Sequence, residues 1–116
     1  MEAFDVLGDP VRRRILELLA GGERTAGEVV EVIAAEFGLT QPAVSRQLRV
    51  LRESGFASVR AEGTRRLYAL DDGGLQDVEA WLHGLRSEWE RRLDALGTEL
   101  ARGRRARRMT NRQEDA

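Results

Sequence analysis

The 116-residue sequence contains no cysteine and only one histidine, His83. The lack of cysteine excludes disulfide bonds, thiolate metal sites and cysteine-based catalysis, and a single histidine excludes a multi-histidine zinc site. No stretch approaches about 18 consecutive apolar residues, so we expect no segment that spans a membrane. The first residues are acidic and lack the basic segment and apolar run of a signal peptide, which predicts a cytoplasmic protein.

Lysine is absent as well, so all 19 basic residues are arginine. The planar guanidinium of arginine suits phosphate groups and guanine edges, but codon usage in a GC-rich genome explains the same bias. The net charge of −1 hides an uneven distribution. Residues 41–70 carry six arginines against two acidic residues, whereas residues 1–40 and 71–100 are both acidic and residues 101–116 are basic. Because nucleic-acid binding needs a local positive surface rather than a positive total, this pattern favours a nucleic-acid partner.

Four helices are expected before residue 55, and most of them have a recognisable start or end. Asp9 followed by Pro10, Thr25 followed three residues later by Glu28, and Thr40 are all typical of helix starts. The expected helices cover Phe4–Leu7, Pro10 to Gly21, Thr25 to about Gly38, and Thr40 to about Gly55.

Two short extended segments and one long helix are expected after residue 55. Phe56–Glu62 and Arg65–Leu70, joined by Gly63 and Thr64, are typical of a β-hairpin. A helix over about 73–101 is indicated by apolar residues at steps of three or four. These residues are Leu75, Val78, Leu82, Leu85, Trp89, Leu93, Leu96 and Leu100, with Trp81 nearby. The sequence thus predicts a mainly α fold with a small β-hairpin, in the order α-α-α-α-β-β-α of a winged helix-turn-helix.

The predicted domain covers residues 1–100, including the long helix, and residues 102–116 form a basic tail. This tail is either a solvated, disordered end or an additional segment that attracts phosphate groups.

The helix that begins at Thr40 is the expected DNA-reading helix. Val44, Leu48 and Leu51 define its buried side, which leaves an open side with polar and basic residues. Arginine and glutamine pair with base edges, and the arginines further along suit phosphate groups. The hairpin adds basic residues that are typical of a wing. The predicted DNA-binding residues are Gln41, Pro42, Ser45, Arg46 and Arg49 on the helix, and Arg60, Arg65 and Arg66 on the wing, with Arg52 as a further phosphate contact. The alternatives are a solvated polar helix face and a hairpin charged for solubility.

The apolar stripe of the long helix is too long for one small domain to cover. We expect it to form the interface of a homodimer, with Leu82, Leu85, Trp89, Leu93 and Leu96 at its centre. Packing of the stripe against the first helices of the same chain is the alternative.

The runs D-P-x-R-R-x-I-L from Asp9 and T-Q-P-A-V-S-R-x-L from Thr40, together with the hairpin, resemble the arsenic-repressor (ArsR) family over about residues 3–100. The resemblance implies a dimeric bacterial repressor that binds an inverted repeat in promoter DNA and associates with the nucleoid when bound. It places the DNA contacts on Gln41, Pro42, Ser45 and Arg46, supported by the wing arginines.

Three features depart from the family pattern. The thiol metal site of the family has no cysteine here, and its terminal-helix zinc site needs more histidines than His83. Although Glu79 and Glu90 lie nearby in sequence, a lone histidine on an amphipathic helix is more often a surface or interface residue than a ligand. The segment Val29–Phe37 is about one turn longer than usual, which would shift the presentation of the reading helix. We therefore expect no metal and no cofactor, and no residue identifies a small-molecule effector.

The remaining alternative is a winged-helix module that contacts another protein. An enzyme is disfavoured, because the sequence has no nucleophile motif, no phosphate-binding glycine loop and no convergent carboxylates.

Overall fold

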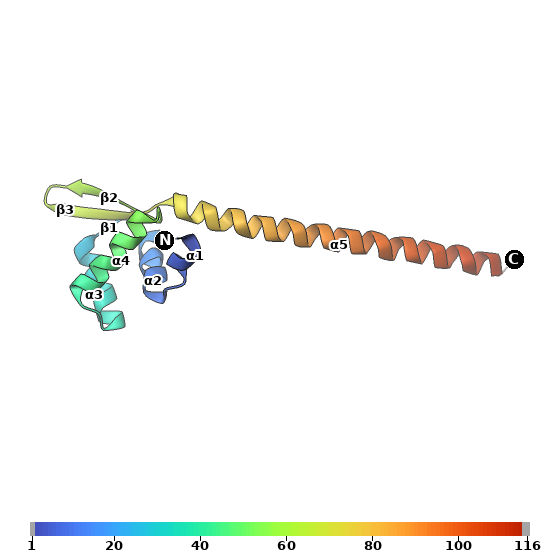
Figure 1. Ribbon diagram of the computed structural model, residues 1–116, viewed down its shortest axis with the longest axis horizontal. Helices are drawn as coiled ribbons and strands as arrows, with labels where there is room; N and C mark the ends of the chain where they lie inside the picture. Colours follow the sequence, from blue (N-terminus) through green and yellow to red (C-terminus); the bar gives the residue numbers. More distant parts are fainter. Residues whose placement is uncertain (1, 115–116) are drawn as a thin grey trace. The chain divides into compact units, whose positions relative to one another are not determined.

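The computed structural model describes residues 2–114, and it describes side chains up to residue 108. The chain divides into two compact units, residues 1–79 and residues 80–116. Figure 1 shows the elements along the chain. They are α1 (Ala3–Leu7), α2 (Pro10–Ala20), β1 (Arg24–Thr25), α3 (Ala26–Phe37), α4 (Gln41–Glu53), β2 (Ala57–Glu62), β3 (Arg65–Leu70) and α5 (Asp72–Glu114).

The predicted helix starts are confirmed by hydrogen bonds to backbone groups that would otherwise lack partners. The Asp9 carboxylate accepts from the backbone N–H of Val11 at 2.7 Å, and Pro10 occupies the first helical position. The hydroxyl of Thr25 accepts from the Glu28 N–H at 3.1 Å, and that of Thr40 accepts from the N–H of Ala43 at 3.3 Å. The first four helices therefore begin close to the positions that the sequence predicts.

The β structure is larger than the predicted hairpin. The hairpin itself is confirmed, with Glu62 opposite Arg65 across a two-residue turn. A third strand, β1, pairs antiparallel with β3, so the sheet has the order β1-β3-β2. A strand of two residues is too short to show an alternating pattern, so the sequence did not predict β1. It forms because the backbone of β3 has a free edge with which Arg24 and Thr25 can pair.

The core of the first unit fixes the helix-turn-helix in place. Val29 and Ile33 from α3 are buried, and so are Val44, Leu48 and Leu51, the buried side of α4 that the sequence predicts. They join other apolar side chains from α1, α2 and the sheet in a single cluster, which includes Val6, Ile15, Leu19, Phe56 and Tyr68. Since α3 and α4 pack through one side each, their opposite sides face solvent.

Helix α5 is longer than predicted. It begins at Asp72 and extends to Glu114, so the segment predicted as a separate tail is helical as far as the structure describes it. The end expected near residue 101 is therefore not observed, and residues 115–116 of the predicted tail lie outside the described residues. No helix in the described part of the chain is long and apolar enough to cross a membrane.

Candidate nucleic-acid interface

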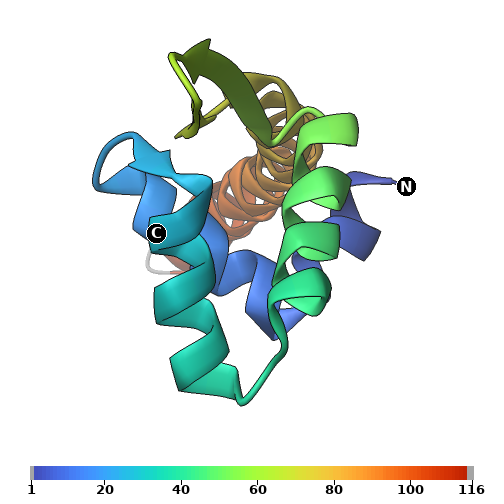
Figure 2. The same cartoon turned by 90° about the vertical axis from the view of Figure 1, so that its left-hand side faces the viewer.

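Helices α3 and α4 form the helix-turn-helix. Gly38 ends α3 with a φ of 67°, a left-handed conformation that glycine adopts without strain, and Thr40 caps α4 two residues later. Figure 2 shows the two helices beside each other, joined at their lower ends by this short turn, with the hairpin at the top of the view. The geometry presents the start of α4 at the surface, as a reading helix requires.

The predicted contact residues of α4 are all exposed. These are Gln41, Pro42, Ser45, Arg46 and Arg49, and Arg52 continues the same open side. They alternate along the helix with the buried Val44, Leu48 and Leu51. The apolar residues thus determine which side of α4 is open.

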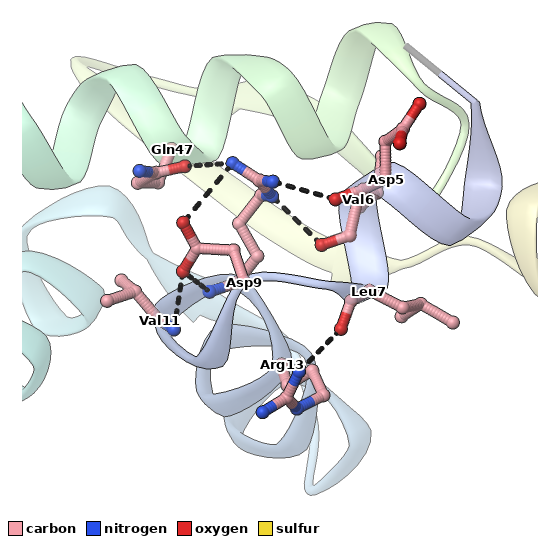
Figure 3. Close-up of polar contacts among 8 residues, drawn as sticks. Asp5, Val6, Leu7, Asp9, Val11, Arg13 and Gln47 are labelled. Carbon is pink, nitrogen blue, oxygen red and sulfur yellow. Dashed lines mark hydrogen bonds and ion pairs between the residues drawn. The ribbon is translucent and has the colours of Figure 1, made fainter.

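Arg12 of α2 forms hydrogen bonds with both α1 and α4, and it contacts α4 near the middle of that helix. Its Nη1 donates to Gln47 Oε1 of α4 at 2.9 Å, and its Nε and Nη2 donate to the carbonyls of Val6 and Asp5 in α1, both at 2.9 Å. An ion pair to Asp9 at 3.5 Å completes the set, and only 11% of the Arg12 side chain is exposed. Figure 3 shows Gln47 and Asp9 on one side of this cluster and Asp5 and Val6 on the other.

Gln47 lies between Arg46 and Leu48, so its bond to Arg12 restrains the rotation of α4 about its axis. Arg12 is therefore a positioning residue for the reading helix. Sequence reasoning identified the motif that contains Arg12 but not this contact, because a bond between residues 35 positions apart leaves no local signal.

The three predicted wing arginines do not share one face of the sheet. Side chains of a strand alternate between faces, and the register pairs Arg60 with Leu67 and Ala61 with Arg66. Arg60 and Arg65 therefore lie on one face together with Glu62. Arg66 lies on the other face, with Tyr68.

Acidic neighbours neutralise Arg60 and Arg65. Arg60 makes a two-point contact with Glu23, with Nε at 2.5 Å and Nη2 at 3.2 Å from its carboxylate oxygens. Glu62 pairs with Arg60 at 3.1 Å and with Arg65 at 3.4 Å. The hydrogen bond to Glu23 raises the pKa of the Arg60 guanidinium. These two arginines therefore form ion pairs with Glu23 and Glu62 of their own chain in the structure.

Arg66 instead completes a groove with α4. One hollow is lined by Ser45, Arg49 and Arg52 of α4 and by Arg66 and Tyr68 of β3, together with Ala26 and Leu48. A second hollow, lined by Pro42, Ser45, Arg46 and Arg49, lies further toward the start of α4. Because the two hollows share Ser45 and Arg49, they form one continuous basic surface, which we call the α4 groove.

The arginines of the first unit separate into two groups by their partners. Six of them bond to carboxylates or carbonyls of their own chain, namely Arg12, Arg13, Arg14, Arg24, Arg60 and Arg65. Among the described residues, the other four make no hydrogen bond or ion pair through their side chains. These four are Arg46, Arg49, Arg52 and Arg66, and all of them line the α4 groove. Within the described first unit, the arginine side chains without an intramolecular partner are therefore those that line the α4 groove.

No metal centre is found in the part of the chain that the structure describes, where no three histidine or acidic side chains gather around one point. His83 is exposed, and its Nε2 lies 3.5 Å from the hydroxyl of Ser87.

Comparison with known proteins agrees with this geometry. Residues 9–59 match the model of the bacterial regulatory protein arsR family. The chain is 35% identical over 79 residues to the transcriptional repressor SdpR of Bacillus subtilis, which covers 68% of this chain and 83% of SdpR. The chain belongs to the arsR family. The family resemblance expected from the sequence is therefore confirmed.

Solved structures of the family share the fold. The crystal structure of an ArsR family transcriptional regulator matches with a TM-score of 0.65 and 31% identity, over 76% of this chain and 87% of that protein. A homodimeric winged helix-turn-helix DNA-binding domain, Mb0332 from Mycobacterium bovis, matches with a TM-score of 0.52 and 31% identity, over 74% of this chain and 76% of that domain. The chain is thus a DNA-binding transcriptional regulator with a winged helix-turn-helix fold, and it is not an enzyme.

Proposed function

We propose that this chain is a transcriptional repressor that binds an inverted-repeat promoter site as a homodimer, in the cytoplasm and at the nucleoid. The α4 groove is the observation that supports DNA binding by these residues. Four guanidinium groups without intramolecular partners lie along the open side of the reading helix and the adjacent wing face. Such groups remain available for phosphate oxygens and base edges.

The polar and basic residues of the α4 groove, together with Gln41 next to it on α4, suit two parts of a DNA duplex. Gln41 and Arg46, near the start of α4, match adenine and guanine edges in the major groove, and Pro42 and Ser45 lie between them. Arg49, Arg52 and Arg66 lie further from the start of α4 and suit phosphate groups that set the register. Arg60 and Arg65 take a supporting role only, since contact with DNA would compete with Glu23 and Glu62.

The homodimer is supported by α5. Leu82, Leu85, Trp89, Leu93 and Leu96 are each about half exposed or more, with Trp89 at 62%. A continuous apolar stripe on one helix is stable in water when another surface covers it. A related domain, Mb0332, is described as homodimeric. Two reading helices about 34–36 Å apart would engage successive major grooves of an inverted repeat.

The test is binding to a duplex from the protein's own promoter, compared with random duplex, at several salt concentrations. We expect a preference for the promoter duplex and a steep loss of affinity with salt. Arg46→Ala should reduce promoter affinity by about 1–3 kcal/mol and relax preference at one base pair of each half-site. Equal binding to promoter and random duplex would instead favour a winged-helix module that contacts another protein.

The expectation that the extra turn before Gly38 alters groove angle and half-site spacing stays a prediction. Footprinting of the bound promoter measures this spacing directly.

A further inference from the structure

Arg60 reaches across the sheet to contact Glu23. Glu23 precedes β1, whereas Arg60 lies in β2, and the sheet order places β3 between these two strands. The register sets Leu67 of β3 opposite Arg60 on one side and opposite Thr25 of β1 on the other. The Arg60 side chain therefore passes over β3 at Leu67, and its Nε and Nη2 lie 2.5 Å and 3.2 Å from the two carboxylate oxygens of Glu23.

This contact combines a packing role with an electrostatic role. Leu67 is only 9% exposed although it does not belong to the core cluster. The aliphatic stem of Arg60, which crosses β3 at this point, contributes to its cover. The Glu23 carboxylate, in contrast, opposes the positive charge of Arg60. A substitution that keeps the hydrogen bond but removes the negative charge separates the two roles.

The charges cancel on the face of the sheet that carries Arg60, Glu62 and Arg65, which we call the outer face of the wing. Glu62 pairs with Arg60 at 3.1 Å and with Arg65 at 3.4 Å, so two carboxylates and two guanidinium groups form one chain of ion pairs with Glu23. The opposite face carries Arg66, which lines the α4 groove and makes no ion pair with the described residues. The wing therefore has an unpaired positive charge on the side of the reading helix and paired charges on its outer face.

We propose that Glu23 is a specificity-determining residue that keeps Arg60 from contacting phosphate groups of DNA. The proposal rests on the proposed function and extends it to a residue outside the DNA-binding surface. Contacts with phosphate groups carry no sequence information, so each arginine that is released on the wing strengthens binding to every duplex. Glu23 thereby limits binding to DNA other than the promoter site.

The position of Arg60 makes this restraint selective. In a promoter complex, base contacts of α4 fix the orientation of the wing, and Arg60 lies on the face opposite to the Arg66 side chain that lines the α4 groove. On random duplex, the protein binds through phosphate groups in many registers and orientations. A released Arg60 reaches phosphate groups in some of these orientations and gains less in the fixed promoter complex. Pairing with Glu23 therefore lowers the affinity for random duplex more than the affinity for the promoter.

Glu23→Gln in the full-length protein tests the role of the charge, because the glutamine oxygen still accepts a hydrogen bond from Arg60. Affinity for random duplex should rise about 2- to 5-fold at low salt. The slope of log affinity against log salt concentration should become steeper by about one for each subunit that contacts DNA. Affinity for the promoter duplex should change by less than about 2-fold, so the ratio of promoter to random binding falls.

Glu36→Gln is the matched control. Glu36 of α3 makes an equivalent two-point contact with Arg14 of α2, with oxygen–nitrogen distances of 2.9 Å and 3.1 Å. The control changes the net charge by the same amount and releases an arginine that lies outside the wing. It should raise the affinity for random duplex less than Glu23→Gln does. An equal rise in both variants would show that only the net charge matters, which overturns the role of Glu23.

Arg60→Gln, added to Glu23→Gln, tests whether the gain in affinity acts through Arg60. The double variant should bind random duplex like the parent protein, and a gain that persists without Arg60 would contradict the proposal. Urea unfolding of each variant measures the packing role separately. Weaker binding of Glu23→Gln to both duplexes, together with a lower unfolding midpoint, would show that the contact only stabilises the sheet.

Glu62→Gln gives a second measurement on the same face, since it removes the partner of Arg65 and one partner of Arg60. It should also raise the affinity for random duplex. Unchanged random-duplex affinity in Glu23→Gln, in a protein that prefers its promoter, would overturn this inference and leave the proposed function intact. Equal binding of the parent protein to promoter and random duplex would overturn the proposed function. The comparison of Glu23→Gln with Glu36→Gln on random duplex would still decide whether Glu23 restrains Arg60.

Discussion

The two units of the chain differ in which side chains they bury and which they leave exposed. Up to residue 79, most large apolar side chains lie in one core, with Phe4 and Phe37 as exposed exceptions, and four arginines without partners line the α4 groove. From residue 80 onward, α5 exposes its large apolar side chains, and among its described charged residues only Glu88 forms ion pairs, with Arg91 and Arg92. The proposed partners correspond to these exposed groups, with DNA at the α4 groove and a second copy of the chain at the apolar stripe of α5.

The strongest test of this comparison is a change to the α5 stripe. Leu85→Glu combined with Leu93→Glu should convert the protein to monomers, because four charges would be buried in the interface. Promoter affinity should fall about 100-fold or more when the two reading helices are no longer linked. Sedimentation measures the first effect and duplex titration the second.

Ser87→Glu combined with Thr98→Glu is the matched control, since it adds the same charge on the other side of α5. This control should remain dimeric. A stable dimer of the Leu85→Glu, Leu93→Glu variant would remove α5 from the interface.

Two glycines of α5 test the difference in packing between the units. At Gly74, in the first unit, a Cβ atom would lie 2.5 Å from the ring of Phe56, which is fully buried. Gly74→Ala should therefore destabilise the protein by about 1–3 kcal/mol through overpacking. At Gly84, in the second unit, a Cβ atom meets nothing within 4 Å. Gly84→Ala should stabilise the helix by about 0.5–1 kcal/mol.

Urea unfolding at fixed protein concentration measures both changes. Equal effects of the two substitutions would contradict the contrast between a packed first unit and an open helix.

The contact between Arg12 and Gln47 tests how the first unit positions its groove. Arg12→Lys keeps the positive charge, but an ammonium group cannot donate to Gln47 and to both α1 carbonyls at once. The substitution should therefore lower the free energy of unfolding by about 1–3 kcal/mol. Promoter affinity should fall as well, although Arg12 lies outside the α4 groove.

Arg13→Lys is the control, because Arg13 is exposed and donates only to the carbonyl of Leu7. If both variants bind the promoter like the parent protein, Arg12 does not position α4.

The smallest expected effect is the difference in DNA affinity between substitutions of two wing arginines, Arg65 and Arg66. Arg66→Ala should weaken binding by about 1 kcal/mol and reduce the dependence of affinity on salt by about one phosphate contact. Arg65→Ala removes the same side chain from the adjacent position, but its charge is already paired with Glu62. Its effect on the salt dependence should be smaller, and equal effects would refute the role of the ion pairs.

Much of the fold follows from local signals in the sequence. The caps at Asp9, Thr25 and Thr40 define helix starts through bonds over two or three residues. The apolar spacing of α4 determines its buried side, and so the open side that carries Gln41 and Arg46. The strand β1 and the end of α5 were not predicted correctly, because the first depends on pairing with β3 and the second lacks a stop signal after residue 101.

The sequence by itself determined the first four helices, the hairpin, the buried side of α4 and the family, because caps, periodicity and motifs act over a few residues. Only the tertiary structure decided which arginines of the first unit are paired within the chain. Glu23 reaches Arg60 across 37 positions, and Arg12 reaches Gln47 across 35. Whether a charge is neutralised depends on distances of a few ångströms between segments far apart in the chain, and the fold sets those distances.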